Sequence, residues 1–470
     1  MITEELEKEE SIEQRKNQIT EGVIWKQLLL FFFPILFGTF FQQLYNTADA
    51  VIVGRYVGKE ALSAVGGSTA TIIGVIVGFF MGLSGGATVI VSQYYGAKRA
   101  DMVKRAVHTA FAFCLLGSLV LMAIGIPLAP AILRAMGTPE DVLPLAISYI
   151  RIYFLGTAGN LLYNIGAAIL RAAGDSKRPL YFLIASCFVN IVMDLLFVVV
   201  LDMGVAGAGW ATILSQLISA VMVITVLMKS NDMYRLIPGE IRLEREMLQK
   251  IVHYGFPTGI QSTMYSFSNL LIQTKINALG TDTVAAWTAY SKIDCIFWMI
   301  VGAFGISVTT FVGQNYGAGK LDRVRKGMKT CLLMTFVTTI FLSTALYFWG
   351  YNFYYLFTTD DSVMAIGVTI LKFLSPMYIA YVLIEILSGT LRGTGDCWVP
   401  TVICCVGICG LRVLWLTFAV PVHNSVYTVA LSYPLTWVTT SLSFLIYYCF
   451  FSKIRRESKA AKAVAFRTEG

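Results

Sequence analysis

Apolar residues in this chain gather in runs long enough to cross a lipid bilayer as helices. A membrane-spanning helix needs about 20 predominantly apolar residues. Twelve such runs occur, at roughly 24–53, 61–92, 104–127, 143–169, 179–201, 204–228, 251–279, 283–312, 330–350, 363–391, 398–420 and 425–451. A charged stretch at 229–250 separates the first six from the last six. The pattern predicts an all-α polytopic membrane protein with twelve transmembrane helices.

Composition agrees with this interpretation. The chain is 56% hydrophobic and only 14% charged, with a mean hydropathy of +0.69, whereas soluble domains carry about 25% charged residues. The net charge of +8 does not indicate a nucleic-acid partner, because basic residues of membrane proteins collect in cytoplasmic loops.

The positions of Lys and Arg predict the orientation. If the N-terminus is cytoplasmic, most of the 36 basic residues fall on the cytoplasmic side. We therefore expect both termini in the cytoplasm and the protein in the plasma membrane. Residues 1–23 have no apolar core, so they are interpreted as a cytoplasmic tail and not a signal peptide. Residues 452–470 are expected to be a basic cytoplasmic tail.

The chain contains an internal repeat. The segment VSQYYGAKRADMVKR (91–105) resembles VGQNYGAGKLDRVRK (312–326), and ILRAAGDSKRP (169–179) resembles TLRGTGDCWVP (390–400), both at an offset of 221 residues. Residues 24–228 and 251–451 are therefore predicted to be homologous six-helix bundles, joined by a cytoplasmic linker at 229–250. An even number of helices per repeat makes the repeats parallel, as in alternating-access carriers. We interpret the repeated motifs as tight intracellular turns, with a role in gating as the alternative.

Ionisable side chains within a bilayer are costly and by default indicate function. The candidates lie in the predicted helices and are Asp49, Asp194, Lys292, Asp294 and Glu385. Three others could extend toward a membrane surface: Lys275, Lys372 and Arg412.

The first helix carries the clearest candidate. Gln42, Tyr45 and Asp49 are spaced to share one helix face. Pro34 removes a backbone hydrogen bond and allows the helix to bend. A bending helix with a buried carboxylate suits the coupling of ion binding to movement. The alternative is an interfacial aspartate near the outer helix end.

The fifth helix carries Asn190 and Asp194, one turn apart and at a depth similar to that of Asp49. Two neighbouring carboxylates in a medium of low dielectric cannot both stay ionised without a cation, so one takes up a proton or a Na⁺ binds between them. Either event couples an ion to the protein. The alternative for Asp194 is a structural hydrogen bond with Asn190.

The second repeat places its acids differently. Trp415 occupies the position equivalent to Asp194, and Glu385 the position equivalent to Asn164. Asp294 and Lys292 lie two residues apart and point to different sides of their helix. For them we expect a structural or cavity-lining role in preference to primary ion coupling.

Other classes of protein find little support. The three histidines are far apart, and the chain has no Walker motif or nucleophile elbow, so we expect neither an enzyme nor an ATP-driven pump. A channel would differ by its uncoupled flux. The nine cysteines form no metal-ligand spacing and are interpreted as apolar packing residues.

Over about residues 24–450, the chain resembles the multidrug and toxic compound extrusion (MATE) family. The resemblance rests on PILFGTFFQQLYNTADAVIVG in the first helix, on VSQYYGA and FVGQNYGAGK, and on LRGTGD. It implies two six-helix bundles arranged in a V, and export of organic cations in exchange for H⁺ or Na⁺ by alternating access.

The resemblance also implies roles for individual residues. In one prokaryotic branch the ion site lies in the N-terminal lobe, and the matching positions here are Asp49, Asn190, Asp194 and Thr212. Further matches are Gln42, Tyr45, Tyr149 and Asn164, with Pro34 as the hinge. Another branch places acids in helix 7, where GFPTGIQSTMYSFSNLL (255–271) has none, although Glu385 and Asp294 leave a second ion or substrate contact open.

The expected protein is thus a monomeric antiporter embedded in the lipid bilayer, with small organic cations as cargo and no cofactor besides the coupling ion, H⁺ or Na⁺. The alternative is a flippase of lipid-linked sugars from the same superfamily. Such a flippase is expected to have cationic cavity residues, whereas the intramembrane charges of the first repeat are acidic.

Overall fold

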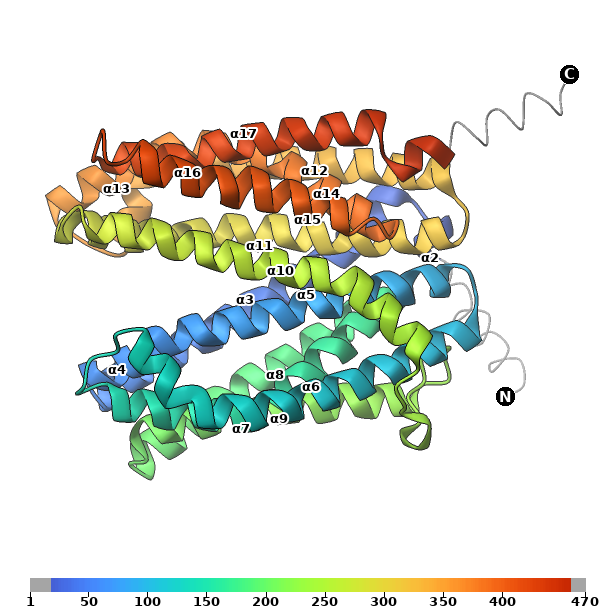
Figure 1. Ribbon diagram of the computed structural model, residues 1–470, viewed down its shortest axis with the longest axis horizontal. Coiled ribbons are helices and arrows are strands. Elements are labelled where there is room, and N and C mark those ends of the chain that lie inside the picture. Colours follow the sequence, from blue (N-terminus) through green and yellow to red (C-terminus); the bar gives the residue numbers. More distant parts are fainter. Residues whose placement is uncertain (1–17, 458–470) are drawn as a thin grey trace, which may run out of the picture. The chain divides into compact units, whose positions relative to one another are not determined.

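The computed structural model describes residues 18–457, and every secondary-structure element in this range is a helix (Figure 1). The elements are α2 (Gln18–Glu21), α3 (Ile24–Tyr56), α4 (Lys59–Gly66), α5 (Ser68–Gly96), α6 (Ala100–Ala135), α7 (Leu143–Ala173), α8 (Lys177–Asp194), η1 (Leu195–Val200), α9 (Gly204–Lys229), η2 (Pro238–Glu240), α10 (Arg245–Asn277), α11 (Thr281–Gly317), α12 (Leu321–Tyr355), α13 (Asp361–Leu374), η3 (Ser375–Met377), α14 (Tyr378–Gly393), α15 (Trp398–Cys404), η4 (Cys405–Gly410), α16 (Leu411–Phe418) and α17 (Val426–Phe450). Each predicted apolar run corresponds to one of these helices or to a consecutive series of them, with different end points. The predicted all-α membrane fold is confirmed.

Eleven helices of the described range are both long and apolar enough to cross a membrane. The run predicted at 251–279 is the exception. It lies in α10, which is 33 residues long but begins in the charged linker and carries polar residues along its length. Its length suits a membrane span, whereas its composition is more polar than that of the others.

The chain forms two compact units. One comprises Phe33–Gly259, and the other comprises the described residues on either side of it. The long helices α3 and α10 each contribute residues to both units. The repeat boundaries at 24–228 and 251–451 remain a prediction from sequence.

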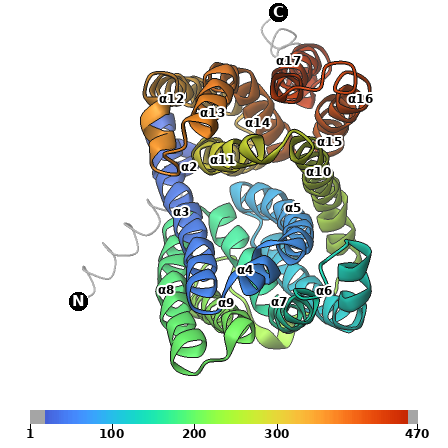
Figure 2. The same cartoon turned by 90° about the vertical axis from the view of Figure 1, so that its left-hand side faces the viewer.

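In the unit Phe33–Gly259, α7 packs against α5, α6 and α9 (Figure 2). Its glycines permit the close approach to α9. A Cβ on Gly156 would lie 2.2 Å from Ile213, and one on Gly166 would lie 2.7 Å from Val223. These glycines therefore set the spacing of the helices that carry the candidate site.

A second close contact in this unit joins α5 to the first half of α10. Each helix presents two glycines four residues apart, Gly82 and Gly86 on α5 and Gly255 and Gly259 on α10. A Cβ on Gly86 would lie 2.4 Å from the backbone N of Gly255, and one on Gly82 would lie 2.4 Å from the backbone N of Gly259. Two small-xxx-small motifs thus bring two backbones together, as is common between membrane helices.

In the other unit, α11 packs against α12, α13 and α14, and α14 packs against α17. Gly305 of α11 leaves room for the side chain of Glu385 on α14, since a Cβ there would lie 2.2 Å from Glu385 Oε1.

The repeated motifs form the predicted turns. Gly174 and Gly395 have φ values of 108° and 86° and end α7 and α14 in the two repeats. Lys98 and Gly319, also at equivalent positions, have φ values of 55° and 72° after α5 and α11. The left-handed conformation favours glycine, which explains three of the four residues.

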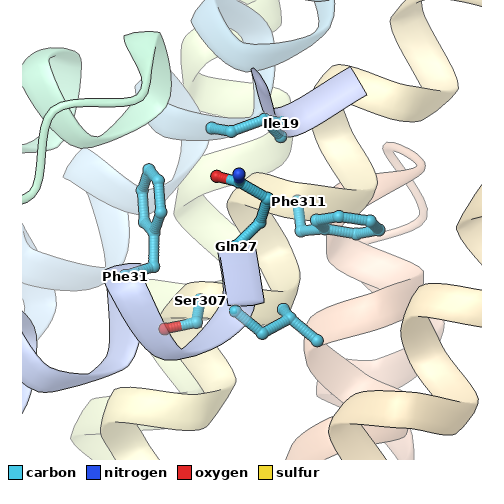
Figure 3. A pocket seen from close by; sticks show the side chains of 6 residues that line it. Ile19, Gln27, Phe31, Ser307 and Phe311 are labelled. Carbon is cyan, nitrogen blue, oxygen red and sulfur yellow. The ribbon is translucent and has the colours of Figure 1, made fainter. Parts of the chain in front are cut away.

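The short segment before α3 is held by the turn between α11 and α12. Arg323 donates to the carbonyl oxygens of Ile19 and Gly22, and Lys320 Nζ donates to that of Thr20 at 3.1 Å. Ile19 also lines a small pocket with Gln27, Phe31 and Phe311, among others (Figure 3). The basic residues of this turn therefore anchor the start of the first membrane helix.

The linker between α9 and α10 is held by α6. Lys104 pairs with Glu240 at 2.8 Å, and this ammonium holds the pKa of the Glu240 carboxyl below its ordinary value. His108 Nε2 accepts the backbone N–H of Ile237 at 3.0 Å, and His108 Nδ1 lies 2.7 Å from the carbonyl oxygen of Lys104. A backbone N–H can only donate, so Nε2 is the acceptor in the contact with Ile237, and Nδ1 is left to face the carbonyl oxygen of Lys104.

We expect His108→Ala to loosen this linker, because the N–H of Ile237 loses its acceptor. One net hydrogen bond corresponds to a roughly 2- to 10-fold faster amide exchange, measurable by hydrogen–deuterium exchange of the peptide spanning 230–244. His423→Ala, in an exposed loop, is the control. Equal exchange in the two variants would contradict the anchoring role.

Candidate functional site

The first helix presents the predicted face. Tyr45 and Asp49 of α3 are buried, and Gln42 is partly buried beside them. Asp49 is only 4% exposed, so its carboxylate is enclosed by the protein. α3 continues through Pro34 without interruption.

The carboxylate of Asp49 has three polar neighbours from two other helices of the same unit. Thr212 of α9 lies with Oγ1 3.2 Å from Asp49 Oδ2. Asn190 and Asp194 of α8 face the same carboxylate. The structure therefore brings together all four residues that the sequence predicted for the ion site, and each is buried.

The hydroxyl of Thr212 can serve only one acceptor. Its Oγ1 also lies 2.9 Å from the carbonyl oxygen of Ala208, and a hydroxyl has a single proton. When that proton is donated to Ala208, the oxygen of Thr212 is free to accept a proton from Asp49 or to ligate a cation. The contact with Asp49 is thus suited to both forms of ion binding.

Buried polar atoms without partners surround this point. Neither oxygen of Asp194, nor Asp49 Oδ1, nor either amide atom of Asn190 makes a hydrogen bond within the described part of the chain. Most buried polar atoms are hydrogen-bonded, so this group is unusual. It also excludes the Asp194–Asn190 hydrogen bond that was the alternative interpretation of α8.

The electrostatics of the pair favour a cation. Asp49 and Asp194 lie close enough to interact directly, and no described Lys or Arg forms an ion pair with either. Two adjacent carboxylates without a cationic side chain need a proton or a metal ion to offset their repulsion. Carboxylate, amide and hydroxyl oxygens are hard ligands, so the donor set fits Na⁺ as well as H⁺.

The backbone of the fifth helix changes from α-helix to π-helix at this site. α8 ends at Asp194, and Leu195–Val200 continue as a π-helix. Such segments are rare and are often found at functional sites. Since Asn190 lies one turn before Asp194, the regular part of α8 keeps both side chains on the face toward α3.

Aromatic and amide side chains form the surroundings. Tyr149 of α7 lies near Asp49, Asp194 and Thr212, while Tyr45 faces Gln42 and Gln216. Sequence analysis missed Gln216 and Tyr153, which interact with each other and with Tyr45. Gln216 could have been found, because it lies one turn beyond Thr212 on the same face of α9.

The remaining candidates lie elsewhere. The amide of Asn164 donates to the backbone and side-chain oxygens of Asn160, both at 2.9 Å, and it is not among the neighbours of Asp49. Asp294 and Glu385 belong to the other unit.

Asp294 has ordinary hydrogen bonds. Its oxygens accept from Tyr378 Oη and from Trp298 Nε1, each at 2.6 Å. Lys292 is exposed and Asp294 is buried, which confirms that they point to different sides of α11. Glu385 accepts a long bond from Tyr381, at 3.4 Å. Each of these two acids thus has a tyrosine partner of its own.

Of the three basic residues that could have extended toward a surface, Arg412 does not. Lys372 is exposed and Lys275 is partly exposed, whereas Arg412 is buried. The interpretation of Arg412 as a side chain reaching a membrane surface was wrong, because its guanidinium is held inside the unit by Ser268 and by the ring of Tyr433.

One protein-family model matches both repeats of this chain. The model of the MatE family matches residues 34–196 and 257–416, one segment in each repeat. The chain belongs to the MATE family. It therefore belongs to a family of transporters and not of enzymes.

The relatives of this transporter match over most of their length. It is 28% identical to the probable multidrug resistance protein YoeA of Bacillus subtilis, covering 87% of this chain and 89% of that one. It is 31% identical to the probable multidrug resistance protein YpnP of the same organism, covering 80% and 84%.

Solved structures of MATE proteins share the fold. A MATE protein in the bent conformation superimposes with a TM-score of 0.85 at 21% identity, covering 95% of this chain and 98% of the other. An outward-facing multidrug resistance transporter of the MOP superfamily also gives a TM-score of 0.85 at 21% identity, covering 95% and 99%.

Proposed function

We propose that this transporter exports small organic cations or drugs in exchange for H⁺ or Na⁺, coupled through Asp49 and Asp194. The observation that carries the proposal is the buried pair of carboxylates with unpartnered oxygens and no cationic side chain. The names of its relatives, several of them multidrug resistance or export proteins, support the class of cargo.

In the proposed cycle the transporter binds the ion and the cargo in turn. An external H⁺ or Na⁺ binds between Asp49 and Asp194, with Asn190 and Thr212 as neutral ligands. Neutralising the pair removes its repulsion and lets α3 bend at Pro34, which releases the cargo outward. The ion then leaves on the cytoplasmic side, and the exposed negative charge favours the next organic cation.

We further propose that the protein acts as a monomer in the plasma membrane with both termini in the cytoplasm. The distribution of Lys and Arg supports this orientation. Accessibility of single cysteines introduced near each terminus to an impermeant thiol reagent in intact cells would test it.

The coupling is tested in inside-out vesicles that contain the transporter. In such vesicles export appears as accumulation of a cationic dye in the lumen. We expect accumulation when the lumen is loaded with H⁺ or with Na⁺ relative to the bath, and imposing each gradient separately identifies the ion. Vesicles without the protein are the control. Equal dye movement with both gradients collapsed would contradict antiport.

A further inference from the structure

Arg412 is a buried cation in the unit that does not contain the acid pair. It is the second residue of α16 and only 3% exposed. It follows the π-helix of Cys405–Gly410, within a segment long and apolar enough to cross the membrane. A charged side chain at such a place is costly and calls for a compensating group.

All side chains that hold the guanidinium are neutral. Nη1 donates to Ser268 Oγ at 3.3 Å and to Asn269 Oδ1 at 3.4 Å. The guanidinium carbon lies 4.3 Å from the ring centre of Tyr433, a favourable cation–π contact. These contacts fix the orientation of the group without neutralising its charge.

The two candidate acids of the same unit are engaged elsewhere. Asp294 accepts from Tyr378 and Trp298, and Glu385 accepts from Tyr381. No carboxylate of the described residues forms an ion pair with Arg412. Buried charges in proteins are normally paired. Arg412 is therefore unusual, since no described residue supplies a countercharge.

One edge of the guanidinium is unused. Nε is buried without a hydrogen-bond partner, and Nη2 donates to no described residue. Nε and Nη2 together form the edge that binds a carboxylate or phosphate through two parallel hydrogen bonds. Ser268 and Asn269 occupy only Nη1, so this edge has no hydrogen-bond partner among the described residues.

We propose that Arg412 is an oxyanion-binding residue, which takes a carboxylate or phosphate group on its Nε and Nη2 edge. The oxyanion comes from the cargo or from a lipid headgroup. If it comes from the cargo, the transporter accepts zwitterionic amphiphiles in addition to simple cations. This extension of the cargo class rests on the proposed export function, whereas oxyanion binding itself does not.

The two sequence repeats carry different side chains at the position of Arg412. The position equivalent to Arg412 in the first repeat is Ile191, directly after Asn190 of the acid site. The same helix of the architecture thus carries an acid and an amide in one repeat and a base in the other.

The test is equilibrium binding of two matched dyes to the purified full-length protein without any ion gradient. One is a xanthylium dye with a free benzoic acid, and the other is its methyl ester. On the unmodified protein we expect the acid to bind more tightly than the ester. Arg412→Gln should weaken binding of the acid about tenfold or more, as expected for loss of a charged hydrogen-bond pair, and leave the ester unchanged. Arg412→Lys keeps the positive charge but loses the two parallel N–H donors of the guanidinium. Its affinity for the acid should therefore lie between those of the unmodified protein and Arg412→Gln.

A second arm identifies the source of the oxyanion. The protein is reconstituted with mixed phosphatidylglycerol and phosphatidylcholine, and the lipid retained after purification is quantified. Selective loss of phosphatidylglycerol in Arg412→Gln indicates a lipid phosphate, whereas selective loss of acid-dye binding indicates cargo. Lys292→Gln, which removes an exposed cation of the same unit, is the control.

The proposal is overturned if acid and ester bind the unmodified protein equally and neither dye nor lipid distinguishes the variants. If Arg412→Gln fails to fold, the comparison of the dyes on the unmodified protein still tests binding of a cargo carboxylate, and Arg412→Lys replaces Arg412→Gln in the lipid measurement; equal dye binding together with equal retention of phosphatidylglycerol then overturns the proposal. Since no gradient is involved, failure of the proposed antiport would leave this result untouched.

Discussion

Asp49→Asn and Asp194→Asn should each abolish ion-driven dye export while the protein still folds and inserts. Asparagine keeps the shape and an oxygen ligand but neither takes up a proton nor carries charge. The remaining single acid no longer experiences the repulsion that makes binding of an ion change the state of the pair. Dye accumulation in inside-out vesicles with imposed ΔpH or ΔpNa measures the loss, which we expect to reach the level of vesicles without the protein.

The matched control is Asp202→Asn, in the turn between η1 and α9. Asp202 is exposed and has a φ of 50°, a conformation that asparagine tolerates well. This variant should transport like the wild type. Full ion-driven export by either Asp49→Asn or Asp194→Asn would remove that residue from the coupling mechanism.

Gly86→Ala should strongly destabilise the unit Phe33–Gly259. The added Cβ would lie 2.4 Å from the backbone N of Gly255 and 2.5 Å from the carbonyl oxygen of Ile251. Backbone cannot move aside as a flexible side chain can, so α5 and α10 must separate. We expect a cost of about 3 kcal/mol or more, at the upper end of overpacking effects, measured as a lower midpoint of thermal unfolding and less monodisperse protein after extraction.

Gly85→Ala provides the comparison at the adjacent position. A Cβ there meets no atom within 4 Å, and alanine has the higher helix propensity. This variant should unfold at or slightly above the wild-type midpoint. If the two alanine variants unfold at the same temperature, the close contact of α5 and α10 does not exist in the folded protein.

The helices and the duplication could be predicted from sequence because both depend on local information. The apolar runs within α6 and α9 predict membrane helices whatever those helices pack against. Glycine-containing turns such as those at Gly174 and Gly395 depend on a few neighbouring residues. The predicted helix bounds differ from the observed ones mainly at the helix ends. For example, α10 starts at Arg245, within the predicted charged linker.

The candidate site was predictable in part. Asp49 and Asp194 stood out because an acid in an apolar run is costly in any fold. The helix period placed Asn190 with Asp194, and resemblance to the MATE family supplied Thr212. The same arguments also selected Asp294 and Glu385, which the structure places in the other unit with hydrogen bonds of their own.

Hydropathy, spacing and repeats are properties of consecutive residues, so the amino-acid sequence alone predicts a duplicated membrane transporter with costly charges in its helices. Which of those charges meet depends on tertiary packing. It placed Asp49, Asp194, Asn190 and Thr212 together, set Gly86 against Gly255, and enclosed Arg412 among neutral groups. These contacts join helices far apart in the chain, and their partners depend on how whole helix surfaces pack, which no local pattern specifies.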